Sequence, residues 1–199
     1  MQESSFQFFG LPGSGKTFIL REMLKDSPDL FEPVPHIKRF ARIKLSIIFI
    51  FVFPALSFKI FQLLFRNKIK LWGYLLHLLT VSFSSHMYAI LHRKDTKVFL
   101  IDEGIFQRIL SVSPDLLSED QLSDLVKLCR RLSSKVLIVE GGDFGRFVSE
   151  PDRMISPRNK FGESYFIKWK KDLIGNFDIL KKLIMENGIK YEIRKSRDV

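Results

Sequence analysis

The residues best suited to chemistry lie near the start of the chain, at residues 10–17. Their sequence, GLPGSGKT, fits the pattern G-x-x-x-x-G-K-[ST] at every fixed position. Glycines let successive backbone N–H groups turn inward around phosphate oxygens, and a helix that follows adds its positive N-terminal end. Lys16 would reach the β- and γ-phosphates of a nucleotide, and the Thr17 hydroxyl would hold Mg²⁺. The expected nucleotide contacts are Gly10, Pro12, Gly13, Ser14, Gly15, Lys16, Thr17 and Phe18.

The residues on both sides of this loop favour a phosphate site over a glycine-rich turn without function. Residues 6–9 predict a short buried strand, and residues 17–25 predict a helix. This strand–loop–helix order is the context that a phosphate loop requires. Average residue frequencies produce the pattern by chance in roughly one of a hundred chains of this length.

Two acidic residues, Asp102 and Glu103, follow an apolar run at residues 98–101. A buried parallel strand there would present both carboxylates beside the phosphate loop. Asp102 is then the expected Mg²⁺ ligand together with Thr17, and Glu103 is a candidate base or a residue that positions a nucleophile. In the helix predicted next, Gln107 and Arg108 either contact a substrate or form an exposed polar face.

The remaining sequence alternates predicted helices and strands. Ser118 begins a helix that runs to about residue 132, and residues 135–140 predict a buried strand. Residues 166–184 carry an apolar stripe at helical spacing, and residues 189–193 alternate as in a final strand. We therefore expect an α/β fold, a three-layer open parallel sheet in a single domain of residues 1–199.

In its element order and in these two motifs, the chain resembles the small P-loop kinases of the adenylate, thymidylate and nucleoside kinase group. Residues 10–17 correspond to the Walker A motif and residues 98–103 to the Walker B motif of P-loop NTPases. The resemblance implies a helical insertion at about residues 31–95 that binds the phosphoryl acceptor. It also implies a lid-like loop at about residues 141–162.

The arginines of that loop would close over the transferred phosphate. Arg146, Arg153 and Arg158 lie within it, and the resemblance implies catalytic roles for Arg153 and Arg158; a basic surface loop is the alternative. One departure concerns residues 102–104, which are Asp-Glu-Gly where many nucleotide kinases of this group have Asp-Arg. Asp-Glu is also what P-loop ATPases use to activate water.

Two functions remain open at this point. The first is an ATP- and Mg²⁺-dependent phosphotransferase that moves the γ-phosphate to a small-molecule hydroxyl or phosphate acceptor, with Lys16, Asp102, Glu103, Arg153 and Arg158 as catalytic residues. The second is a P-loop ATPase or nucleotide-switched binding module, peripheral to a membrane. The two differ in whether an acceptor is needed for loss of the γ-phosphate.

The middle of the chain is unusually apolar. Residues 45–58 carry no charge, and residues 71–91 contain no Asp, Glu, Lys or Arg, so each run approaches the roughly 20 apolar residues that span a bilayer. A membrane hairpin would place the basic residues 66–70 outside, against the positive-inside tendency. Buried helices of an acceptor-binding subdomain are the first expectation. Helices of residues 41–92 that lie on an anionic membrane surface are the second expectation, and a true span is the third. A hydrophobic acceptor pocket or a protein partner would account for the same apolar surplus.

The formal net charge of +10 suits nucleic acid, anionic lipid or a polyphosphate substrate. No RNA-binding signature or zinc spacing is present, so nucleic acid is not expected. The chain begins almost at its first strand, without room for a targeting segment, and an ATP site favours the cytoplasm. Cys129 is the only cysteine, and its helical spacing from Leu122 and Leu125 predicts a packing role.

Overall fold

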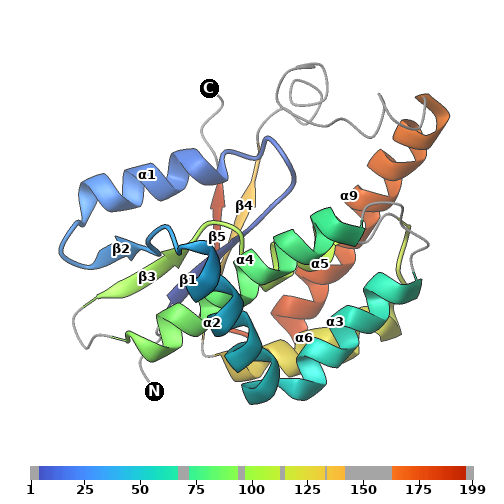
Figure 1. The fold of residues 1–199 in the computed structure, drawn as a ribbon. Helices are drawn as coiled ribbons and strands as arrows, with labels where there is room; N and C mark the ends of the chain where they lie inside the picture. Colours follow the sequence, from blue (N-terminus) through green and yellow to red (C-terminus); the bar gives the residue numbers. More distant parts are fainter. Residues whose placement is uncertain are drawn as a thin grey trace.

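A parallel sheet of five strands, in the order β2-β3-β1-β4-β5, organises the computed structural model (Figure 1). The structure describes residues 5–66, 72–93, 97–112, 115–132, 134–141 and 163–195. The strands are β1 (Ser5–Phe9), β2 (Phe31–Pro33), β3 (Val98–Ile101), β4 (Ser134–Glu140) and β5 (Tyr191–Lys195). The helices are α1 (Lys16–Asp26), α2 (Arg39–Val52), α3 (Pro54–Arg66), α4 (Trp72–Leu91), α5 (Ile105–Val112), α6 (Glu119–Cys129), the 3-10 turn η1 (Arg130–Leu132) and α9 (Glu163–Glu186).

The central strand β1 is buried on both faces. Phe8 packs with Ile19 of α1 on one face, whereas Phe9 stacks on Phe177 of α9 on the other, with ring centroids 4.9 Å apart. Helix α1 thus covers one side of the sheet, and α4, α5, α6 and α9 lie on the opposite side (Figure 1). The predicted α/β architecture, an all-parallel sheet with helices on both faces, is confirmed.

The register of β1 against its two neighbours brings their carboxyl ends together. Gln7 pairs with Ile101 of β3 and with Val136 of β4. In open α/β sheets, ligands bind at this edge, beyond the carboxyl ends of the strands. The loop after β1 and the acidic residues after β3 therefore meet at one edge of the sheet.

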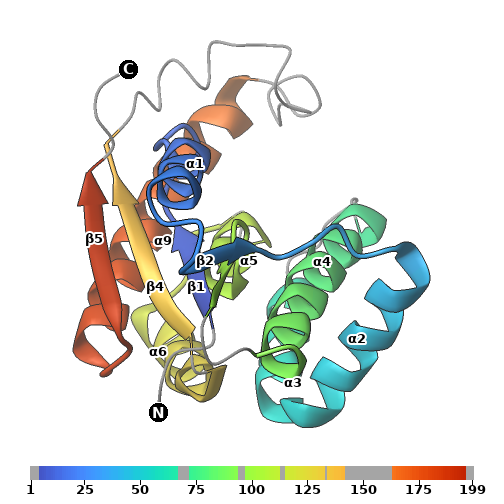
Figure 2. The ribbon, with the colours of Figure 1, turned by 90° about the vertical axis from the view of Figure 1, so that its left-hand side faces the viewer.

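Three helices, α2, α3 and α4, connect β2 to β3 and form a group at the side of the molecule (Figure 2). Helix α4 lies against the sheet, and α2 packs on α4, where the Ser46 hydroxyl donates to the Thr80 carbonyl at 2.9 Å. Nearby, Phe49 stacks on Phe83 with ring centroids 4.5 Å apart. The edge strand β2 lies inside the range predicted as a helical insertion and was missed.

No single helix among the described residues is both long enough and apolar enough to span a membrane. Helix α2 and residues 54–63 of α3 together reach the length and the hydropathy of a span, but they are bent by 107° where they join. Pro54 begins α3, as its missing N–H allows at a helix start.

Several local predictions hold in detail. Ser118 caps α6 in a capping box: its hydroxyl accepts from the Gln121 N–H at 3.3 Å, and the Gln121 side chain accepts from the Ser118 N–H at 3.2 Å. Cys129 is buried, and burial raises the pKa of its thiol well above the ordinary value. The predicted packing role of Cys129 is therefore confirmed.

Candidate phosphate-binding site

The turn from β1 into α1 needs glycine at two positions. Gly13 has a φ of 78° and Gly15 a φ of 85°, in the left-handed region that side chains with a Cβ rarely adopt. Gly15 is the N-cap of α1, and within the described chain no side chain caps this helix and its first turn holds no acidic residue. The first N–H groups and the positive end of α1 are thus available to an anion.

Gly10 is required for a different reason, which is close packing. A Cβ added at this position would lie 2.6 Å from the Ser14 Oγ and 2.7 Å from the carbonyl oxygen of Val139 in β4. The Gly10 N–H donates to the Oε1 of Gln107 in α5, 3.2 Å away. These contacts fix the start of the loop against β4 and α5.

Lys16 folds back over the loop that precedes it. Its Nζ donates to the carbonyl oxygens of Gly10, at 2.9 Å, and of Leu11, at 2.8 Å. Burial lowers the pKa of the Lys16 ammonium to about 8, and the charge of Asp102 acts in the opposite direction. Lys16 is therefore a partly buried cation at the mouth of the loop, where a phosphate would offer it a stronger partner than neutral carbonyls.

The acidic residues after β3 stand beside this lysine. Desolvation raises the pKa of the Asp102 carboxyl, against the opposing charges of Lys16 and Arg108. The half-exposed Glu103 forms an ion pair with the Arg108 guanidinium. The sequence-predicted residues Lys16, Asp102 and Glu103 thus belong to one charged cluster at the carboxyl edge of β1 and β3.

One alternative from the sequence is wrong. Gln107 and Arg108 do not form an exposed polar face, because they are only 6% and 4% exposed. Gln107 accepts from the phosphate loop and Arg108 pairs with Glu103. The apolar residues of α5 are buried in the core on one side of the helix. Its polar residues therefore face the phosphate loop and the residues that follow β3.

Sequence reasoning missed two buried polar residues that support the cluster. The Nε2 of His86, in α4, accepts from the Ile105 N–H at 3.2 Å, and burial lowers the pKa of this histidine to about 3, so that it stays neutral. Gln7 of β1 presses on Gly104, where an added Cβ would lie 2.5 Å from the Gln7 Oε1. The sequence signals that could have indicated these two residues are a single glutamine within an apolar strand and a histidine within an apolar helix.

Mg²⁺ is compatible with the residues present. Thr17, exposed in the first turn of α1, and Asp102 offer a hydroxyl and a carboxylate, the hard oxygen ligands that Mg²⁺ takes alongside phosphates and water. Among the described residues, no group of three or more His, Cys, Asp or Glu side chains could hold a metal ion. A site completed by substrate phosphates needs fewer protein ligands than that.

The predicted lid residues Arg146, Arg153 and Arg158 lie outside the described residues. The described chain reaches Gly141, directly after β4, which is the neighbour of β1 in the sheet. Gly141 thus follows the carboxyl end of a strand next to β1.

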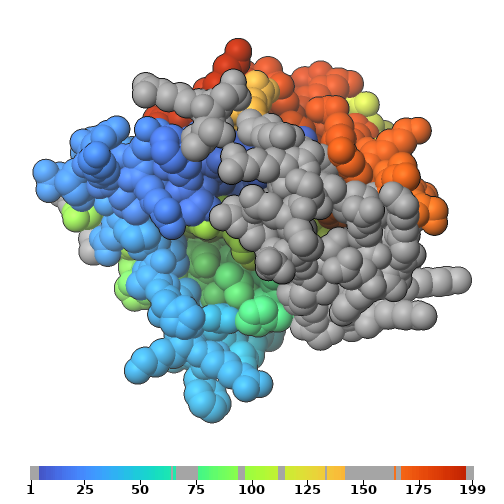
Figure 3. Space-filling model, turned by 90° about the horizontal axis from the view of Figure 1, so that it is seen from above, coloured from blue at the N-terminus to red at the C-terminus, as the bar shows by residue number. Residues whose placement is uncertain are grey.

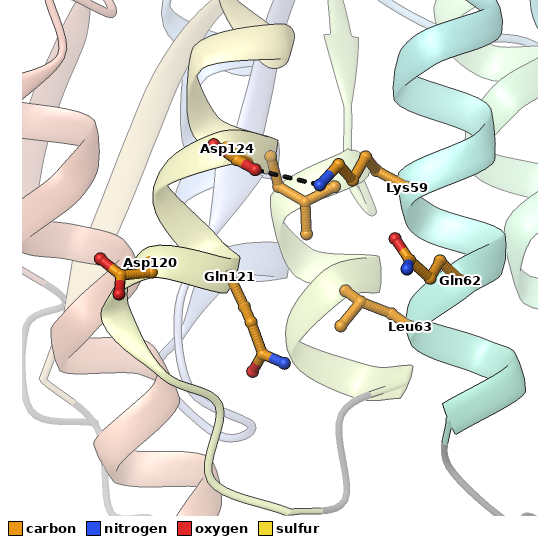
Figure 4. A pocket seen from close by; sticks show the side chains of 7 residues that line it. Lys59, Gln62, Leu63, Asp120, Gln121 and Asp124 are labelled. Atoms are coloured by element: carbon orange, nitrogen blue, oxygen red, sulfur yellow. Dashed lines mark hydrogen bonds and ion pairs between the residues drawn. The ribbon is translucent and has the colours of Figure 1, made fainter.

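A groove of about 210 Å³ between α3 and α6 is separate from this cluster (Figure 4). Lys59 and Asp124 bridge it with an ion pair of 3.0 Å, and Leu63 lies at its wall. None of the predicted site residues lines it. The groove is a surface feature between two helices and is not the predicted nucleotide site.

No protein-family model, curated protein or solved structure matches the chain. The candidate site is thus defined by the chain's own residues. They comprise a glycine-dependent loop, an uncapped helix start, a partly buried lysine and two carboxylates directly after the neighbouring strand.

Proposed function

We propose that the chain is a P-loop phosphotransferase that binds MgATP at residues 10–17 and moves the γ-phosphate to a small-molecule hydroxyl or phosphate acceptor. The main support is the position of Lys16 and Asp102. They follow adjacent parallel strands, and each affects the pKa of the other. A cation and a carboxylate beside an anion-binding loop are what phosphoryl transfer needs for binding and charge stabilisation.

Nucleotide binding would use the loop in three ways. The N–H groups at Gly13 and Gly15 and the start of α1 would bind phosphate oxygens. Lys16 would leave the loop carbonyls and contact the β- and γ-phosphates, while Thr17 and Asp102 would hold the cation. Mg²⁺, when bound, supplies positive charge to the β- and γ-phosphate oxygens.

Glu103 and Arg108 would act at the acceptor side. Glu103 pairs with Arg108 and is half exposed, so it is proposed to accept a hydrogen bond from an acceptor hydroxyl and orient it. Arg108, the neighbouring cation, also affects the pKa of Asp102 and would help to stabilise negative charge. Arg153 and Arg158 are proposed to do the same from the lid.

The test follows the γ-phosphate of labelled ATP, with Mg²⁺ and a pooled small-molecule extract. We expect label in a new compound for the wild-type chain and none for Lys16→Ala. Lys25→Ala is the matched control, because Lys25 is exposed at the opposite end of α1. Equal transfer by wild type and Lys16→Ala would refute the site.

An ATPase is the second candidate. It is favoured by Asp102-Glu103 and by the half-exposed Glu103 side chain, which a water molecule can reach. In the same assay this function gives free phosphate at a rate that the extract does not change. Label in a new compound rules it out as the main activity.

A further inference from the structure

The outer side of α2 carries a row of exposed apolar side chains. Four residues form this outer stripe: Phe40, Ile43, Ile47 and Phe51, which are 88%, 45%, 47% and 80% exposed. Their spacing of three, four and four residues puts them on one face of the helix. The stripe is about three turns long, and the exposed Lys44, four residues after Phe40, lies on the same face.

The opposite side of the same helix is already occupied. Phe49 is fully buried against Phe83 of α4, and Ser46 is buried where it bonds to Thr80. Seen from above, the start of α2 projects from the body of the molecule (light blue in Figure 3). The outer stripe is therefore a second apolar face that the described parts of the chain leave exposed.

The sequence segment that contains the stripe is strongly one-sided in charge. Residues 34–94 contain ten Lys or Arg residues and no Asp or Glu, so this segment carries the whole formal net charge of +10 while the rest of the chain is balanced. Lys38, Arg39 and Lys44, all exposed, lie at the start of α2 or beside the stripe. An apolar face flanked by lysine and arginine is the pattern of a helix that lies in an anionic membrane interface.

We infer that α2 docks the protein onto an anionic membrane surface, with the outer stripe inserted at the headgroup level and the basic residues against acidic lipids. Charge complementarity selects this occupant over a second copy of the chain. A dimer through the stripe would place two segments of net charge +10 against each other. The inference does not depend on the proposed phosphotransferase activity.

The test measures cosedimentation of the full chain with vesicles. One set is phosphatidylcholine alone, and the other contains about a third phosphatidylserine. We expect binding to the anionic vesicles, weak binding to the neutral ones, and loss of binding as salt shortens the screening length to below about 8 Å. Absence of binding to anionic vesicles at low salt would overturn the proposal.

Two pairs of double variants locate the contact. Phe40→Gln/Phe51→Gln should weaken binding about tenfold or more. Leu30→Gln/Ile167→Gln, which alters side chains 57% and 63% exposed elsewhere, should not weaken it. Equal binding by these two variants would refute a docking role for α2.

A second pair of double variants, which removes positive charges, tests the proposal independently. Arg39→Gln/Lys44→Gln should weaken binding about fivefold for each residue. Lys25→Gln/Lys171→Gln removes the same charge from exposed positions on α1 and α9 and should have a smaller effect. A different result would be a wild-type chain that is a dimer, that does not bind vesicles, and that Phe40→Gln/Phe51→Gln converts to a monomer. The stripe would then be a self-association surface, and the membrane proposal would be wrong.

Discussion

Protonation of Lys16 should report on phosphate binding. Burial lowers the pKa of Lys16 to about 8 in the free protein, where its partners are two neutral carbonyls. At pH 8 the side chain is therefore about half protonated. A phosphate in the loop favours the ammonium form, so binding of MgATP at pH 8 should take up about half a proton. Between pH 8 and 10 the affinity should fall by up to about tenfold per pH unit.

Isothermal titration calorimetry in two buffers of different ionisation enthalpy measures this proton uptake directly. Lys16→Met should bind MgATP more weakly and with no proton uptake at pH 8. Lys25→Met, altered at an exposed position of the same helix, should behave as wild type. The reasoning is refuted if wild type binds without taking up a proton, or if Lys16→Met takes up as many protons as wild type.

The same shift affects stability. The pKa of Lys16 is 10.5 when unfolded and about 8 when folded, so the unfolded chain binds more protons between these values. The free energy of unfolding should therefore rise as pH increases from 8 to 10.5, by about 3 kcal/mol in total. Urea denaturation at pH 7.5 and 10 should show this gain in wild type relative to Lys16→Met. If the difference in free energy of unfolding between wild type and Lys16→Met does not change with pH, Lys16 is well solvated in the folded protein.

Three further predictions concern the supporting residues. Gly10→Ala should lower the free energy of unfolding by about 1–3 kcal/mol, seen as a lower urea midpoint, because the new methyl group meets a backbone carbonyl at 2.7 Å. The pKa of His86 is about 3 when folded and 6.5 when unfolded, so acidification from pH 6.5 to 5 should cost wild type about 2 kcal/mol. His86→Gln should lack that loss, whereas His92→Gln, at an exposed position, should keep it. Cys129 should react with a thiol reagent only in denaturant, because it is buried and burial raises its pKa; fast reaction in buffer would contradict its placement.

The local elements could be predicted because their signals are local. The loop at residues 10–17 is set by backbone geometry that only glycine allows, and the capping box at Ser118 needs only three neighbouring residues. The edge strand β2 could not be predicted, since three residues that end in a proline show no period and gain their hydrogen bonds from β3. The order of the strands in the sheet also cannot be predicted from the periodicity of the sequence.

The support of the site was harder to predict than its charged residues. Gln107 is 97 positions from Gly10, whose N–H it accepts, so only the folded chain reveals the contact. Helix α2 is apolar on both sides, so the period of its sequence does not say which side meets α4 and which stays exposed.

The sequence departs from many nucleotide kinases in having Asp-Glu after β3, but the fold brings an arginine there by another route. Arg108 comes from the first turns of α5, pairs with Glu103 and affects the pKa of Asp102. An arginine therefore stands beside the strand end even though it does not follow the aspartate in sequence. The charge that Asp-Arg would place there is still present.

This arrangement leaves the cluster electrically balanced, because the charges of Lys16 and Arg108 offset those of Asp102 and Glu103. MgATP brings about two negative charges, which the loop N–H groups and the start of α1 offset only in part. Further cations must come from outside these four side chains. The sequence offers three arginines in residues 142–162, namely Arg146, Arg153 and Arg158. Under the proposed function, charge balance therefore favours a contribution of the predicted lid arginines to binding of the nucleotide phosphates.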